Sequence, residues 1–208
     1  MVAARRFSLW LDAQNLLAAT QHIEIDLYGS LALTGKGHAA DTAVVAGLAG
    51  EIPSQTSLDA IMAHWQRAEA QGLLRLAGER EVQFLPSRDL HFQMRQRQPF
   101  HSNALSFTAR GTDGEILAKR MYFSVGGGFV VDEDEAGRNS LDSGGPSAPF
   151  DVASGADLLE MGKVSGLSIA DMMMANELAQ QSREAVEAGI DAIAAAMGTK
   201  FVGLEGLV

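Results

Sequence analysis

The sequence predicts an α+β fold in which a mostly antiparallel sheet, between about residues 22 and 131, carries helices on one face. Apolar residues recur at helical spacing over residues 2–19 and 57–70, whereas several short runs after residue 73 have the character of strands. The pair Asp113-Gly114 lies between two of these runs and is typical of a hairpin turn. With 47% hydrophobic and 20% charged residues, the chain has enough apolar side chains to fill a core.

The order of the elements follows from local patterns. Apolar residues that repeat every four positions predict a helix over residues 2–19, and strict alternation predicts a half-buried strand over residues 23–27. A short helix is expected over residues 43–48, with Asp41 as its cap or first-turn anion, and Ser57 is expected to cap the next helix. The later strands are expected at residues 73–76, 82–85, 89–94, 104–109, 116–124 and 129–131.

The composition changes after the last predicted strand. Residues 1–134 form a first domain, residues 135–156 are rich in Ser, Gly and Pro and predict a linker, and residues 157–208 are helical. The acidic run 132–135 lacks the glycine and the ligand spacing of a calcium loop, so we interpret it as solvated linker. The C-terminal helices are expected over residues 156–163, 168–188 and 190–197.

Charge and amino-acid content exclude several classes of protein. Lys+Arg 16 against Asp+Glu 26 gives a net charge of −10, which argues against a duplex nucleic-acid binder and against docking on an anionic membrane. The chain has no cysteine, which excludes disulfides, catalytic thiols and thiolate-ligated zinc or iron–sulfur centres within it. No apolar run approaches the ~20 residues of a membrane span, and residues 1–7 lead into no signal-peptide core. We therefore expect a cytoplasmic protein.

The segment from Tyr28 to Asp41 is the first candidate site. In Gly35-Lys36-Gly37-His38 two glycines surround Lys36, which allows backbone N–H groups to approach a ligand. His38 precedes a predicted helix start, whose positive end suits a carboxylate and favours a neutral imidazole that can act as a base. The alternative is a plain glycine turn with a surface lysine and a capping Asp41.

Two further motifs are candidates for ligand contacts. His101 and Asn103 lie two residues apart on an extended segment and therefore point to the same side, although a polar loop before a strand has the same composition. Ser124 is followed by three glycines that include Gly127, which would let the backbone approach either a ligand or a neighbouring strand.

A metal-dependent hydrolase is a different class to consider. It would require His38, Asp41 and His101 to share one ion as a two-histidine, one-carboxylate site. Asp41 has a competing role at the helix start, so we expect no metal ligands in this chain. The remaining histidines are expected to be ordinary surface or core residues: His22, His64 and His91.

Taken together, these motifs resemble those of the β domain of bacterial iron–sulfur L-serine dehydratases (L-serine ammonia-lyases). The segments that carry the resemblance are, in order, Tyr28–His38 with Asp41, Phe100–Asn103 and Tyr122–Glu133. Residues 1–7 are similar to the segment after the family's Ser-Ser-Ser-His-Thr stretch, and Ile169–Glu177 resembles the opening helix of its α domain. The implied fold is like the allosteric substrate-binding domain of some phosphoglycerate dehydrogenases.

The resemblance implies deamination of L-serine to pyruvate and ammonia by β-elimination, assisted by a [4Fe–4S] cluster in the full-length family. His38 and His101 correspond to catalytic histidines, and either is a candidate for the base at Cα, with His38 preferred because of its position at the helix start. The residues expected to hold the carboxylate or amino group of L-serine or a similar small amino acid are Lys36, Asn103, Ser124 and Gly127.

The chain departs from the family at both ends. The Ser-Ser-Ser-His-Thr segment and nearly all of the α domain with its cysteine ligands are not in the sequence, so we expect a fragment or truncated product that binds no cluster and releases no pyruvate alone. The expected partners are a missing α domain or subunit and a second copy of the chain. The alternative function is a non-catalytic, allosteric module for an amino acid or small anion, which needs Lys36 and the glycine loops but not two converging histidines.

Overall fold

A computed structural model describes residues 1–126, 128–137, 148–152 and 154–204 of the chain. The residues form two compact units, Met1–Ser140 and Leu141–Val208, and each is described by itself. All three candidate motifs belong to the first unit.

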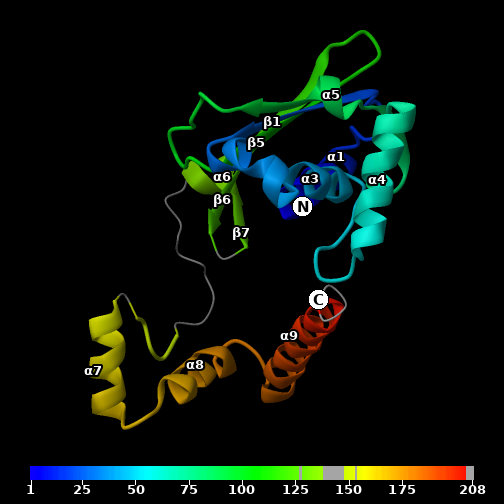
Figure 1. The fold of residues 1–208 in the computed structure, drawn as a ribbon. Helices are drawn as coiled ribbons and strands as arrows, with labels where there is room; N and C mark the ends of the chain where they lie inside the picture. Colours follow the sequence, from blue (N-terminus) through cyan, green and yellow to red (C-terminus); the bar gives the residue numbers. More distant parts are fainter. Residues whose placement is uncertain (127, 138–147, 153, 205–208) are drawn as a thin grey trace. The chain divides into compact units, whose positions relative to one another are not determined.

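The first unit is built on one mixed sheet (Figure 1). Its central strand β1 (His22–Tyr28) runs antiparallel to β5 (Ala104–Arg110). β5 pairs in the same sense with β6 (Ile116–Gly126), which in turn pairs with β7 (Phe129–Asp132). The antiparallel pair of β5 and β6 confirms the predicted hairpin, and Gly114, with a φ of +79°, occupies the turn between them.

On its other side, β1 has two parallel neighbours. It pairs with β4 (Leu90–Gln93) over four positions and with β3 (Arg80–Gln83) at one position. β3 forms an antiparallel pair with β2 (Leu73–Leu76) at the edge of the sheet. Most strand pairs are antiparallel, which confirms the predicted fold class; the likeness to an allosteric domain stays a prediction.

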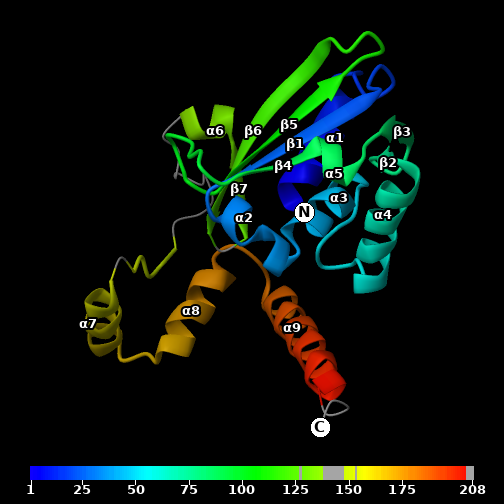
Figure 2. The ribbon, with the colours of Figure 1, turned by 45° about the horizontal axis from the view of Figure 1, so that its top comes forward.

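Three helices cover one face of this sheet in both views (Figure 1, Figure 2). They are α1 (Val2–Ala13), α3 (Ala40–Leu48) and α4 (Leu58–Gln71). Phe107 of β5 stacks on Phe7 of α1 with ring centroids 5.0 Å apart, so the helix and the sheet share one core. Its fully buried members include Phe7, Leu11, Ile23, Ile25, Leu27, Leu48, Phe84 and Phe107.

Short helical segments connect the larger elements of the first unit. α2 (Ser30–Leu33) and the 3₁₀ helix η1 (Gly35–His38) follow β1 directly, so the first candidate motif is a chain of two short helices. α5 (Pro86–Asp89) precedes β4, and α6 (Glu133–Gly137) follows β7.

Local capping confirms some predicted helix boundaries and corrects another. The Ser57 hydroxyl accepts a hydrogen bond from the Ala60 N–H at 3.2 Å, as predicted for the cap of α4. Asp41 lies in the first turn of α3, but the cap position is Ala39, whose φ is +54°. Of the two roles predicted for Asp41, the structure therefore shows the first-turn anion and not the cap.

The helix predicted over residues 2–19 is wrong in its last third, because α1 ends at Ala13. The Gln14 N–H still bonds to the Trp10 carbonyl at 3.0 Å, but Asn15 adopts a φ of +58°, which an α-helix does not continue. Asparagine tolerates this left-handed conformation at the ends of helices. The apolar repeat beyond Ala13 instead lines a set of turns that lead into β1.

The described part of the second unit contains α7 (Gly155–Ser165), α8 (Ile169–Leu178) and α9 (Arg183–Leu204). The single helix predicted over residues 168–188 is wrong, because the chain turns at 179–182 before α9 begins. Part of the predicted linker, namely residues 138–147 and 153, lies outside the described residues. Over the ranges that the structure covers, no helix is both long and apolar enough to cross a membrane.

Candidate functional site

The first two candidate motifs meet where β1 ends and β5 begins. Gly29 follows β1 with a φ of +59°, and a Cβ built on it would lie 2.0 Å from the carbonyl oxygen of Ser102. No side chain fits in that space, so the backbone of the loop before β5 packs directly on the turn after β1. Gly29 lies in the first candidate segment but was not among its predicted ligand contacts, although its place between a strand and Ser30 is a signal for such a close approach.

Asn103 joins all three motifs by hydrogen bonds. Its side-chain oxygen Oδ1 accepts from the backbone N–H of Ser30 at 3.1 Å and from the Ser30 hydroxyl at 2.6 Å. Its backbone carbonyl accepts from the N–H of Ser124 at 2.9 Å. The amide oxygen is thus used within the protein, whereas the described residues offer the amide nitrogen Nδ2 no acceptor, so Nδ2 can contact a ligand.

The two candidate catalytic histidines have complementary hydrogen bonds. His38 Nδ1 lies 3.0 Å from the carbonyl oxygen of Thr34, which can only accept, so Nδ1 carries the proton and Nε2 of the neutral ring is an acceptor. His101 Nδ1 accepts the N–H of Asn103 at 3.1 Å, so Nε2 of its neutral ring is a donor. His38 is exposed and His101 half-buried, so solvent or a ligand can reach both rings.

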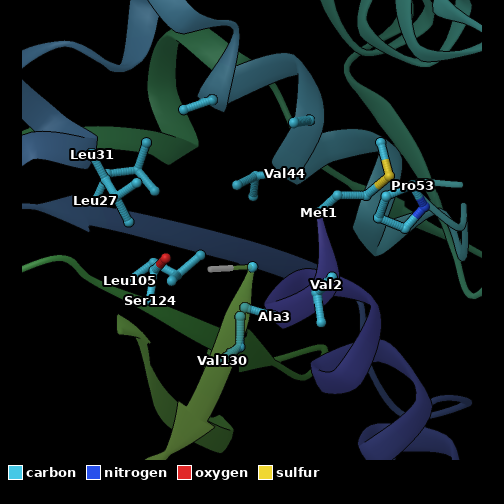
Figure 3. A pocket seen from close by; sticks show the side chains of 13 residues that line it. Met1, Val2, Ala3, Leu27, Leu31, Val44, Pro53, Leu105, Ser124 and Val130 are labelled. Carbon is cyan, nitrogen blue, oxygen red and sulfur yellow. The ribbon is translucent and has the colours of Figure 1, made fainter. Parts of the chain in front are cut away.

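An apolar pocket of about 270 Å³ opens beside this junction (Figure 3). Among the described lining residues, Ser124 supplies the one side chain with a hydroxyl, and the other side chains of the wall are apolar. Its lining residues are Met1, Val2, Ala3, Leu27, Leu31, Ala40, Ala43, Val44, Pro53, Leu105, Ser124, Gly128 and Val130. Gly127, predicted to contact substrate, lies outside the described residues, so its role stays a prediction.

Lys36 and Asp41 line a second hollow, which we call the charged pocket. It has a volume of about 460 Å³ and is bordered by Lys36, Asp41, Trp65, Glu69, Pro86, Ser87, Leu90 and Phe92. Lys36 and Ser124 therefore line different pockets, and among the described lining residues of these two pockets neither His38 nor His101 occurs. That both imidazoles meet over one substrate stays a prediction.

Tyr122, which opens the third motif, belongs to the core instead of the site. Its ring packs at an angle against Phe107, with 5.8 Å between centroids. Burial raises the pKa of its phenol to about 12, although the nearby charges of Arg120 and Arg6 act in the opposite direction. The phenol therefore stays protonated across the physiological range.

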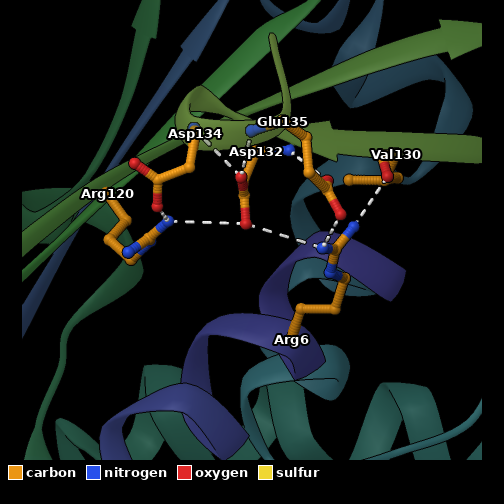
Figure 4. Close-up of polar contacts among 6 residues, drawn as sticks. All are labelled: Arg6, Arg120, Val130, Asp132, Asp134 and Glu135. Atoms are coloured by element: carbon orange, nitrogen blue, oxygen red, sulfur yellow. Dashed lines mark hydrogen bonds and ion pairs between the residues drawn. The ribbon is translucent and has the colours of Figure 1, made fainter. Parts of the chain in front are cut away.

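The acidic run 132–135 is not solvated linker, and that interpretation is wrong for most of it (Figure 4). The Asp132 carboxylate accepts the N–H groups of Asp134 and Glu135, and Glu135 accepts the N–H of Asp132 at 2.8 Å. This reciprocal arrangement caps the start of α6. Arg6 from the start of the chain and Arg120 from the neighbouring strand β6 then bind the same carboxylates, which the sequence pattern could not reveal.

The two arginines tie β7 and α6 to the rest of the first unit. Arg6 of α1 donates to the Val130 carbonyl at 2.7 Å and to Glu135 at 2.9 Å. Arg120 of β6 donates to Asp134 at 2.6 Å and lies 4.9 Å from the centre of the Trp10 ring. Because Val130 lines the apolar pocket, this ion-pair network also holds one wall of that pocket.

We expect Arg120→Gln to lower the free energy of unfolding by about 1–3 kcal/mol, because Arg120 is only 13% exposed and pairs with both Asp132 and Asp134. Amide hydrogen exchange over residues 128–137 should become faster. Arg110→Gln is the matched control: Arg110 pairs with Glu24 at 3.0 Å but is more exposed, so its loss should cost less than about 1 kcal/mol. Equal losses in the two variants would contradict this role for Arg120.

Comparison with known proteins identifies the family of the chain. The family model of the serine dehydratase beta chain matches residues 1–135, which include every candidate motif. The chain belongs to this family. Curated relatives include L-serine dehydratase TdcG and L-serine dehydratase 2 of Escherichia coli (strain K12), which are 41% and 38% identical over 191 and 188 residues. L-serine dehydratase of Streptomyces coelicolor is 32% identical over 190 residues.

This serine dehydratase beta-chain member spans about two fifths of its relatives. The matches cover 90–91% of the chain but 40–42% of the three relatives. The larger part of each of these relatives therefore lies outside the matched region.

The side chains of this serine dehydratase beta chain do not fit an iron–sulfur cluster. The sequence contains no cysteine, and cysteine thiolates are the ligands that such clusters require. Within the described ranges, no three His, Asp or Glu side chains gather as a metal site either, so His38, Asp41 and His101 do not form the alternative hydrolase centre.

Proposed function

We propose that this chain is the substrate-handling β part of an L-serine dehydratase, and that a separate part of the enzyme holds the iron–sulfur cluster. The observation that carries the proposal is the junction at Asn103, which ties all three motifs together within the region that matches the family. The cluster enters no step that we assign to this chain, because the chain has no thiolate to hold it.

In this proposal the two histidines have different tasks. Elimination of water from serine requires a base that removes the proton from Cα while the bond from Cβ to the hydroxyl oxygen breaks, a Cα=Cβ double bond forms and the hydroxyl group takes up a proton and leaves as water. His38 takes the role of this base, because its Nε2 is an acceptor when Nδ1 donates to Thr34. His101 offers an Nε2–H and holds an oxygen of the substrate. The aminoacrylate that forms hydrolyses to pyruvate and ammonia.

The substrate carboxylate needs donors as well. Asn103 Nδ2 is a candidate, because Oδ1 of the same amide is already fixed by Ser30 and the orientation of the group is therefore set. Ser124, Lys36 and Gly127 stay predicted substrate contacts. Lys36 would have to reach the site from the charged pocket, and Ser124 from the apolar pocket.

A chimera tests the proposal. The part of TdcG that matches residues 1–135 is replaced by residues 1–135 of this chain, and pyruvate release from L-serine is measured after anaerobic loading of the cluster. We expect activity from the chimera. His38→Gln and His101→Gln should each reduce kcat by about 100-fold or more, because general acid–base catalysis contributes about that much.

The visible absorbance of the cluster provides a control for folding and loading. His91→Gln is a matched histidine control, since His91 lies exposed on β4 and should leave pyruvate release unchanged. A chimera that loads its cluster but releases no pyruvate would overturn the proposal. So would full activity in both the His38 and the His101 variant.

A further inference from the structure

Both charged and apolar side chains border the charged pocket. Lys36 of η1, Asp41 of α3 and Glu69 of α4 bring one cation and two anions to its border. Trp65 of α4, Phe92 of β4 and Leu90 supply apolar surface to the same hollow. Its volume of about 460 Å³ lies within the range of ordinary ligand sites.

The charges of this pocket are only partly used within the protein. The Lys36 ammonium lies 5.4 Å from the centre of the Phe92 ring, and within the described residues it forms no ion pair. Glu69 is exposed, and the described part of the chain offers its carboxylate no cation within 4 Å. One oxygen of Asp41 accepts the N–H of Thr42 at 2.9 Å, which leaves the other oxygen for a ligand.

This combination selects among ligands. A simple anion would be attracted by Lys36 but repelled by the two carboxylates. A simple cation would be attracted by the carboxylates but repelled by Lys36. A zwitterion satisfies both, with its carboxylate toward Lys36 and its ammonium toward Glu69 and Asp41. A ligand that also covers Trp65 and Phe92 must have a large apolar side chain.

We propose that the charged pocket binds a free α-amino acid with a large apolar side chain, such as L-phenylalanine. The inference stands on the lining of this pocket and does not depend on the proposed dehydratase function. It assigns Glu69, Trp65 and Phe92 a role in ligand binding. The ligand is chemically distinct from L-serine, whose short polar side chain leaves the aromatic wall exposed.

The tryptophan content of the chain allows a direct measurement. Trp10 and Trp65 are its two tryptophans, so the tryptophan fluorescence of the Trp10→Phe variant comes from Trp65 in the charged pocket alone. We expect L-phenylalanine to change the Trp65 emission saturably. Phenylpropionate, which lacks the ammonium, and phenethylamine, which lacks the carboxylate, should each bind at least about tenfold more weakly, because each leaves one charged contact unmade.

Variants then assign the contacts. Lys36→Met and Glu69→Gln should each weaken L-phenylalanine binding by about tenfold or more, and Lys119→Met, which removes an exposed lysine of β6, should have no effect. Calorimetric titration of the unmodified chain provides the same affinities if Trp10→Phe disturbs the fold. The absence of a saturable signal up to about 10 mM would overturn the inference. Equal affinity for L-serine, for inorganic phosphate or for phenylpropionate would overturn it as well.

Discussion

Gly29→Ala is expected to lower the free energy of unfolding by about 2–5 kcal/mol. The added Cβ would meet the Ser102 carbonyl oxygen at 2.0 Å and its carbon at 2.6 Å, and both belong to backbone that cannot move aside cheaply. The φ of +59° adds the strain of a left-handed conformation, about 1–2 kcal/mol. Denaturant unfolding of the two chains measures the difference.

Gly72→Ala separates the two contributions to this effect. Gly72 ends α4 with a φ of +66°, but nothing lies within 4 Å of the position of its missing Cβ. This control should therefore cost only the strain, about 1–2 kcal/mol. Equal losses at the two glycines would mean that the contact with Ser102 is unimportant.

The same substitution should also affect the site. Moving the Ser102 backbone away from residue 29 lengthens the hydrogen bonds from Ser30 to Asn103, which are now 2.6 and 3.1 Å. In the chimera with TdcG we expect Gly29→Ala to reduce pyruvate release strongly. An active Gly29→Ala chimera would contradict the role assigned to the junction at Asn103.

Asp89→Asn is expected to lower the free energy of unfolding by about 2–3 kcal/mol at pH 7. The Asp89 side chain is 2% exposed, accepts the Leu85 N–H at 2.7 Å, pairs with Arg88 at 2.7 Å and lies 3.0 Å from His22 Nε2. It therefore connects the start of α5 to the start of β1. Removal of its charge leaves these donors without the ionised acceptor that now satisfies them.

The cost of Asp89→Asn should depend on pH. Burial acts to raise the pKa of Asp89, but hydrogen bonds from Arg88, Leu85 and His22 outweigh it and hold the pKa below its ordinary value of 3.8. A carboxyl whose pKa is lower in the folded state stabilises the fold above its unfolded pKa, and this stabilisation is lost as the pH falls through the folded pKa.

Unfolding measured between pH 7 and pH 2 checks this dependence. The difference between the native chain and Asp89→Asn should be largest at neutral pH and should shrink below about pH 4. Glu24→Gln is the control, because its pair with Arg110 lies nearer the surface and should contribute less than about 1 kcal/mol. A difference that stays constant over this range would contradict the role of the Asp89 charge.

Short-range chemistry made much of the fold predictable. Ser57 caps α4, and Asp113-Gly114 turns the hairpin between β5 and β6, because the side chain or the backbone freedom of one residue acts within a few positions. The alternation over residues 23–27 likewise marks β1, since one side of that strand faces the core.

Other features depended on contacts between distant residues. The acidic run 132–135 has the composition of a linker, yet Arg6 lies more than 120 positions away and binds it. The break at 179–182 is local by contrast, because the Ser182 hydroxyl accepts the N–H of Ala185 at 3.3 Å at the start of α9. Composition and periodicity do not report a remote partner such as Arg6.

By itself, the sequence of this protein determined the fold class, the family resemblance and the short list of residues that carry chemistry, because periodicity and motif order are properties of neighbouring residues. Only the tertiary structure decided that Asn103 binds Ser30 and that Lys36 lies in a different pocket from Ser124. The physical reason is that these arrangements arise when the sheet brings segments some 70 residues apart into contact, and the hydrogen-bond partners of a side chain are then those that packing supplies.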